Sequence, residues 1–121
     1  MKLKLAIRSI SVWGHPDIRT WQPDDPGKVA EIVFLDIGER TKESSDTFSI
    51  RVATPAGLST LQTRKGILAI RPLLVMQRYD LVDLRRWLRY TVAKCEGENW
   101  TACVNNLRLY FDWEYEGYKE V

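Results

Sequence analysis

The chain has 121 residues, of which 45% are hydrophobic, and its 18 basic and 16 acidic residues leave a formal net charge of +2. This length can bury one continuous core without a metal or disulfides, so we expect a single domain over residues 1–121. The near balance of charge excludes a global field that would draw the chain to nucleic acid or to an anionic membrane, so partners must be sought in local patches.

An alternating stretch near the N-terminus predicts the first strand. Its apolar residues reach Ile7 and resume at Ile10, which changes the phase of the alternation. The strand therefore either carries a bulge near Ser9 or ends there. The next segment, residues 14–27, contains three Pro residues and predicts a loop, because Pro removes a backbone donor and restricts the residue before it.

Two further stretches predict a hairpin. Residues 28–38 are rich in β-branched and aromatic residues on both faces, which is typical of a strand that is covered on both sides or of a central strand. Residues 39–46 are polar and predict a turn. Over residues 48–52, apolar and polar side chains alternate, which indicates a half-buried strand that pairs with the preceding one.

The middle of the chain mixes helix and strand signals. Thr54 can accept from the first free amides of a helix and Pro55 suits its first turn, so we expect a short helix over residues 54–62. Residues 67–79 are apolar and extended in character. Within them, Pro72 marks an edge position, a kink or a break between two short strand pieces.

Two helices are predicted near the C-terminus. After Asp80 as N-cap, apolar residues recur at helical spacing and end before Gly97: Leu81, Leu84, Leu88, Val92 and Cys95. Asn99 is predicted to be the N-cap of a second helix. The apolar stripe of this helix does not determine where within residues 110–114 the helix ends. Strands first and helices later predict an α+β fold: an antiparallel sheet of four to five strands with two C-terminal helices packed on one face and one short helix.

The N-terminal residues and the two cysteines indicate the cellular compartment of the protein. Arg8 interrupts the first apolar residues, so they lack the apolar core of a secretory leader, and no run of the sequence is long enough to span a membrane. Cys95 and Cys103 are too few for a zinc site or a secreted disulfide framework, and we expect both to be reduced and buried. These observations favour the cytoplasm.

The sequence shows no constellation for catalysis. The single histidine, His15, lies in a predicted loop, and no sequence motif indicates a catalytic partner within hydrogen-bonding distance. We therefore interpret His15 as a solvated side chain. Phosphate-cradling loops, paired-histidine motifs and nucleophile elbows are missing from the sequence. Glu114 and Glu116 could form an acid/base pair, but acids flanked by aromatics are far commoner on surfaces. We therefore expect no catalytic residue, no cofactor, no metal and no enzymatic activity.

The C-terminal tail combines rings and carboxylates, and it is our candidate partner-binding site. Its residues are Asp112, Trp113, Glu114, Tyr115, Glu116 and Tyr118. Four acids against Lys119, counting Glu120, give this tail a local charge of −3, which would attract a basic partner. Aromatic side chains supply rigid contact area for a protein interface. Whether these rings are buried or exposed stays open from the sequence.

A second patch offers an alternative function. Arg85, Arg86 and Arg89 surround Trp87 and could hold phosphates and stack on bases, as in a nucleic-acid-binding module. On a helix, however, Arg85 and Arg89 share a face while Trp87 points elsewhere, so nucleic acid is disfavoured. A structural homodimer that associates through its aromatic tail is the other alternative, and a homo-oligomer therefore stays open.

Five short motifs follow one another over almost the whole chain. They are Trp21-x-Pro23-x-Asp25-Pro26, Phe48-x-Ile50-x-Val52-x-Thr54-Pro55, Tyr79-Asp80, Cys95-x-Gly97-x-x-Trp100 and Trp113-Glu114-Tyr115-Glu116-x-Tyr118. In this order and spacing they resemble the immunity protein 8 family of bacterial polymorphic toxin systems.

The resemblance implies an α+β protein of the cytoplasm, encoded beside a toxin, that protects the producing cell by binding that toxin. We accordingly expect a cognate toxin as the partner and no membrane association. One position departs from the family pattern, which often has a bulky ring around the position of Gly57. We expect Gly57 to weaken the short helix that contains it.

Overall fold

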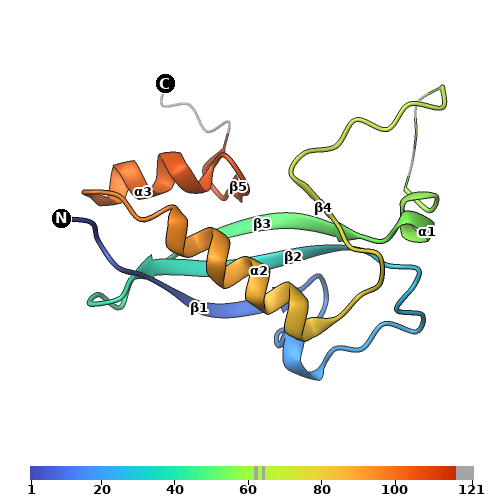
Figure 1. Ribbon diagram of the computed structural model, residues 1–121, viewed down its shortest axis with the longest axis horizontal. Coiled ribbons are helices and arrows are strands. Elements are labelled where there is room, and N and C mark those ends of the chain that lie inside the picture. The colour runs from blue at the N-terminus through green and yellow to red at the C-terminus, as the bar shows by residue number, and fades with distance from the viewer. Residues whose placement is uncertain (62, 64, 117–121) are drawn as a thin grey trace.

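The computed structural model describes residues 1–61, 63 and 65–116, which fold into a five-stranded sheet with helices (Figure 1). In chain order the elements are β1 (Leu5–Val12), the 3-10 helix η1 (Ile18–Thr20), β2 (Ala30–Glu39), β3 (Asp46–Ala53), α1 (Pro55–Leu58), β4 (Leu73–Val75), α2 (Leu81–Lys94), α3 (Trp100–Leu107) and β5 (Asp112–Trp113). The predicted α+β class is confirmed.

The strands pair in the order β1, β2, β3, β4, and β5 also pairs with β3. The predicted hairpin is the antiparallel pair of β2 and β3, and β1 is antiparallel to β2. Beyond β3, the short β4 runs parallel to residues 51–53, whereas β5 runs antiparallel to residues 48–49. Both short strands therefore lie along one edge of β3, and β1 forms the opposite edge of the described sheet.

The sequence left two alternatives for the phase change in the first strand, a bulge near Ser9 or an end of the strand. The structure shows the bulge. The register with β2 shifts between Ile7 and Ser9. Ile7 then lies opposite Ile37 and Ile10 opposite Leu35, so the bulge keeps both apolar side chains on the face that carries the core.

One face of the sheet forms the core together with α2 and α3. Alternate residues of β2 and β3 are buried because successive side chains of a strand point to opposite faces. They join buried residues of both helices in one cluster, which includes Val33, Leu35, Ile37, Phe48, Ile50, Val52, Leu84, Leu88, Val92, Cys103, Val104 and Leu107. Figure 1 shows α2 crossing this sheet. The two C-terminal helices thus pack on one face, as predicted.

All three predicted N-caps are confirmed. The side chains of Thr54, Asp80 and Asn99 each accept a hydrogen bond from the backbone N–H three residues later, at 3.1, 3.0 and 2.8 Å. A short polar side chain at this position satisfies one of the unpaired amides of the first helical turn.

The first and last helices are shorter than predicted. α1 ends at Leu58 rather than at residue 62, because the following amides bond three residues back, Thr60 to Gly57 and Leu61 to Leu58. α3 ends at Leu107, before the range of residues 110–114 that the sequence left open. The apolar pattern of the sequence continues beyond the end of α3 because Phe111, in the turn that follows the helix, is also buried in the core.

The apolar stretch of residues 67–79 forms only the three residues of β4, and Pro72 lies immediately before that strand. The fifth strand comes instead from residues 112–113, within the C-terminal tail, for which the sequence predicted no strand. The pairing partner of β5 lies far away in the sequence, so no local pattern indicates this strand.

Candidate functional site: the C-terminal strip and the arginines of α2

After α3 the chain returns to the sheet and pairs with β3. This pairing holds most of the predicted partner-binding residues in place. We call Asp112, Trp113, Glu114, Tyr115 and Glu116 the C-terminal strip; the sixth predicted residue, Tyr118, lies outside the described residues. In β5, Trp113 pairs with Phe48 and Asp112 with Ser49. The backbone N–H of Glu114 donates to the Thr47 carbonyl at 2.9 Å. The strip therefore starts on a rigid support.

The two described rings of the strip differ in exposure. Trp113 is half-buried, and its indole Nε1 donates to Asp46 Oδ2 at 2.9 Å. Tyr115 is 46% exposed and packs edge-on against Trp113, with ring centroids 5.0 Å apart. Trp113 thus serves partly as a structural anchor, while Tyr115 presents accessible aromatic surface held by its neighbour.

The carboxylates of the strip already have contacts within the chain. Glu114 Oε2 accepts a hydrogen bond from the backbone N–H of Thr47. Glu114 also hydrogen bonds the Tyr115 hydroxyl and repels its phenolate form, which raises the pKa of Tyr115. Glu116 forms a two-pronged ion pair with Arg108, with nitrogen–oxygen distances of 2.9 and 2.5 Å. Desolvation and the nearby Glu116 raise the pKa of Asp112.

Two arginines lie beside the strip, so the local negative charge is smaller than the −3 counted from the sequence. Arg108 neutralises Glu116 and also lies over the Trp113 ring, 5.9 Å from its centroid. Arg71 favours the ionised forms of both Asp112 and Glu116, and all four charged residues line a cavity of about 490 Å³. The strip is consequently a mixed-charge surface with exposed acids.

The ion pair of Glu116 gives a pH-dependent prediction. The hydrogen bond from Arg108 lowers the folded-state pKa of Glu116, so the pair stabilises the fold above the ordinary pKa of Glu, and the gain is lost as pH falls through the lowered value. We expect Arg108→Gln to raise the pKa of Glu116, measured by NMR titration of its carboxyl carbon. The stability difference between the two proteins should disappear in acid.

Arg86→Gln is the control for this titration, because Arg86 pairs with Asp83 on α2 and not with the strip. It should leave the Glu116 titration unchanged. Identical Glu116 curves in wild type and Arg108→Gln would show that the ion pair does not form in solution.

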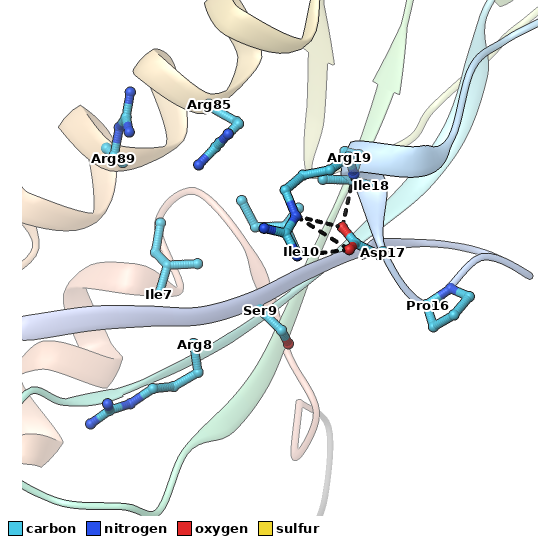
Figure 2. A pocket seen from close by; sticks show the side chains of 10 residues that line it. All are labelled: Ile7, Arg8, Ser9, Ile10, Pro16, Asp17, Ile18, Arg19, Arg85 and Arg89. Atoms are coloured by element: carbon cyan, nitrogen blue, oxygen red, sulfur yellow. Dashed lines mark hydrogen bonds and ion pairs between the residues drawn. The ribbon is translucent and has the colours of Figure 1, made fainter.

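The second predicted patch is divided by the helix. Arg86 pairs with Asp83 at 3.3 Å. Trp87 is half-buried, with its ring edge-on to Phe111 at 6.3 Å between centroids. Arg85 and Arg89 share a face, as predicted, and line one cavity with residues of β1 and η1 (Figure 2). Because Trp87 packs into the protein, it does not provide the stacking platform that the nucleic-acid alternative needs.

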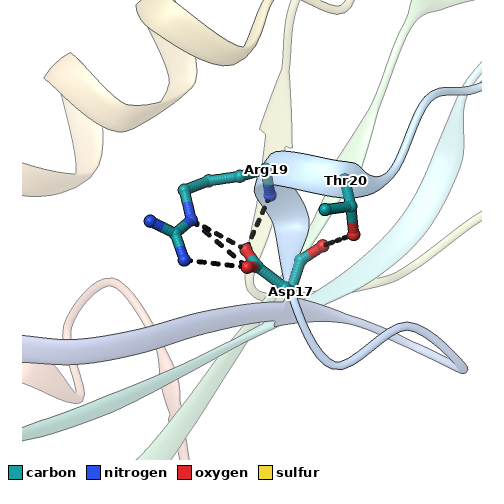
Figure 3. Close-up of polar contacts among 3 residues, drawn as sticks. All are labelled: Asp17, Arg19 and Thr20. Atoms are coloured by element: carbon teal, nitrogen blue, oxygen red, sulfur yellow. Dashed lines mark hydrogen bonds and ion pairs between the residues drawn. The ribbon is translucent and has the colours of Figure 1, made fainter.

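Sequence reasoning missed this cavity, which has a volume of about 380 Å³. Its wall includes Asp17, which accepts from the Arg19 backbone N–H at 2.9 Å and from the Arg19 guanidinium at 2.9 to 3.2 Å (Figure 3). These bonds lower the pKa of Asp17, and Arg85 adds a weaker attraction. The only available signal was the four-residue spacing of Arg85 and Arg89 on one helix face.

The remaining candidates for chemistry are dispersed. His15 is exposed, and both cysteines are buried and free, as predicted. Burial raises the pKa of Cys95 to about 11, which makes its thiol unreactive. In the part of the chain that the structure describes, no three His, Cys, Asp or Glu side chains gather as metal ligands. The described helices are also too short or too polar to cross a bilayer.

An α+β scaffold that holds exposed acids and a supported ring at a sheet edge has the features of a protein-binding module. Residues 5–118 match the family model of Immunity protein 8, so the chain belongs to this family, and the resemblance noted in its motifs is confirmed. Comparison with curated proteins gave no match, and comparison with solved structures gave none either.

Proposed function

We propose that this protein is an immunity protein that binds and neutralises a cognate bacterial polymorphic toxin by protein–protein contact. Membership of the Immunity protein 8 family over residues 5–118 is the observation that carries this proposal. The protein would protect the producing cell from its own toxin without catalysing a reaction, acting in the cytoplasm as one domain. The two free, buried thiols agree with a reducing compartment.

The C-terminal strip is the proposed contact surface. Tyr115 would enter a pocket of the toxin, with Trp113 holding its ring in place. Tyr118, which lies outside the described residues, is proposed as a further aromatic anchor. Asp112, Glu114 and Glu116 would meet basic residues of the toxin. Glu114 and Glu116 have partners within the chain, so docking would share or exchange the bonds to Thr47 and Arg108.

Such contact would inhibit the toxin in one of two ways, by covering its active site or by blocking a motion that it requires. A toxin that acts on nucleic acid would carry a basic substrate groove, which is an electrostatic match for exposed acids. The acids of the strip would then occupy the position of the substrate phosphates.

The function is tested with the toxin domain encoded beside this gene. Cells that express that domain should stop growing, and co-expression of this chain should restore growth. A catalytically inactive form of the domain should bind the purified chain in calorimetry. Continued killing despite ample immunity protein, together with undetectable binding, would overturn the proposed function.

Replacement of Tyr115 by alanine is expected to weaken toxin binding at least ~10-fold, because a truncated aromatic anchor leaves its pocket unfilled. Tyr90→Ala is the matched control, since Tyr90 is a 68% exposed ring on α2 whose ring contact is with Lys94 and not with a residue of the strip. Titration calorimetry with the inactive toxin domain measures both variants, and thermal unfolding checks that both remain folded. Equal affinities for Tyr115→Ala and wild type would remove Tyr115 from the interface.

A further inference from the structure

The outer edge of β1 is covered at both ends and open in the middle. Near its start, the backbone N–H of Leu5 donates to Glu96 Oε2 at 2.8 Å. At its end, Val12 exchanges two backbone hydrogen bonds with His15, at 2.7 and 3.0 Å. Residues 7–10, between these two points, line the cavity below α2 (Figure 2). A short stretch of edge strand is thus left accessible.

The backbone of Ile10 points to this open side. The N–H of Trp13 donates to the Ile32 carbonyl at 3.1 Å, so Trp13 directs its backbone groups toward β2. Directions alternate along an antiparallel pair, and the register is continuous from Ile10 to Val12, so Ile10, three residues before Trp13 and on the same side of the bulge, directs its N–H and C=O away from β2. Unpaired edge groups of this kind are a template for an added strand.

The cavity also carries surplus positive charge. Within the described part of the chain, neither Arg85 nor Arg89 forms a hydrogen bond or an ion pair, in contrast to Arg86. Asp17 is the one acid among the lining residues, and it is engaged by Arg19. Arg8 points from β1 to the opposite side, where it donates to carbonyls of the β2–β3 turn. Arg85 and Arg89 thus remain available to a negatively charged partner.

We propose that the open edge of β1 and the pair Arg85 and Arg89 form a second toxin-binding surface, which takes an extended acidic segment of the toxin as an added strand. The backbone of that segment would pair with Ile10, and its Asp or Glu side chains would meet the two arginines. The apolar side chains of Ile7 and Ile10 would form the floor. This inference rests on the proposed function and adds a partner segment of stated chemistry.

A peptide fits this surface better than a nucleic acid does. Both carry negative charge, but the residues that line the cavity include no aromatic ring for base stacking, and the outward carbonyl of Ile10 would repel a phosphate. A peptide strand instead supplies the amide that this carbonyl needs. The C-terminal strip lies at the opposite edge of the sheet, so the two surfaces would contact different parts of the toxin.

The test compares the wild-type chain, the charge-reversed double variant Arg85→Glu/Arg89→Glu and the control Arg86→Glu in binding to the inactive toxin domain. We expect the double variant to bind at least ~10-fold more weakly and the control to change less than ~2-fold. If charge reversal impairs folding, Arg85→Gln/Arg89→Gln replaces it, with an expected loss of at least ~5-fold. Amide hydrogen exchange of wild-type Ile10, measured by NMR, should slow on toxin binding, while that of Val12 changes little.

The outcomes separate this inference from the proposed function. If wild type binds the toxin but the double variant binds equally well, or Ile10 exchange is unchanged, the second surface is wrong and the function stands. If the wild-type chain does not bind the toxin, both the proposed function and the second binding surface are wrong. Salt-sensitive binding of a single-stranded oligonucleotide that requires Arg85 and Arg89, with toxin affinity unaffected by their replacement, would assign the cavity to nucleic acid and overturn the inference.

Discussion

Replacing Thr54 by valine is expected to lower the free energy of unfolding by about 3 kcal/mol, because it leaves two buried amides without an acceptor. Thr54 is 1% exposed. Its hydroxyl accepts from the N–H groups of Val29 and Gly57, at 2.9 and 3.1 Å, and donates to the Gly27 carbonyl at 2.8 Å. Valine has the same shape but supplies none of these bonds. Urea unfolding followed by tryptophan fluorescence measures the loss.

Thr54→Ser is the matched control, because serine keeps the hydroxyl and removes only a methyl group. It should cost about 1 kcal/mol, the transfer free energy of one buried methyl group. Equal stabilities of Thr54→Val and wild type would mean that the amides of Val29 and Gly57 find other acceptors. The side chain would then fill space without serving as the helix cap.

Gly57→Ala is expected to destabilise the protein by ~3 kcal/mol or more, because the added methyl group would require backbone movement. A Cβ built at Gly57 would lie 1.8 Å from the Val29 carbonyl oxygen and 2.7 Å from the Val29 nitrogen. The Val29 carbonyl cannot move freely, since it accepts from the Thr54 backbone N–H at 2.8 Å. Thermal and urea unfolding measure the change.

Ala56→Ser is the control at the neighbouring position of α1, where the side chain is exposed. It should change the free energy of unfolding by less than ~0.5 kcal/mol, as surface substitutions usually do. Full stability of Gly57→Ala would indicate that α1 can move away from Val29, and that their close approach is not required by the fold.

The contact between Gly57 and Val29 changes the meaning of the one departure from the family pattern. The sequence suggested that Gly57 weakens the short helix through its low helix propensity. In the structure α1 forms, capped by Thr54, and the absence of a side chain lets it approach the start of the sheet. A bulky ring at this position would not fit the backbone of this protein.

The candidate site was predictable only in its sequence-adjacent part. The acids and rings of the C-terminal strip are neighbours along the chain, so their composition alone suggested a binding surface. Their partners were not visible: Asp46 and Thr47 lie 67 residues before the groups that they bond. The sequence charge count of −3 also ignored Arg71 and Arg108, which the fold places beside the acids. Contacts of this range leave no periodic signal.

The amino-acid sequence by itself determined the hairpin of β2 and β3, the amphipathic α2, the three N-caps and the phase change in β1, although not whether that change is a bulge or an end of the strand. Each depends on side-chain alternation or hydrogen bonds within a few residues, so a short window contains the whole cause. The tertiary structure decided the pairing of β4 and β5 with β3, the early ends of α1 and α3, the neutralisation of Glu116 and the open basic edge of β1. These features depend on which distant segments meet, because backbone pairing and charge compensation act through space and not along the chain.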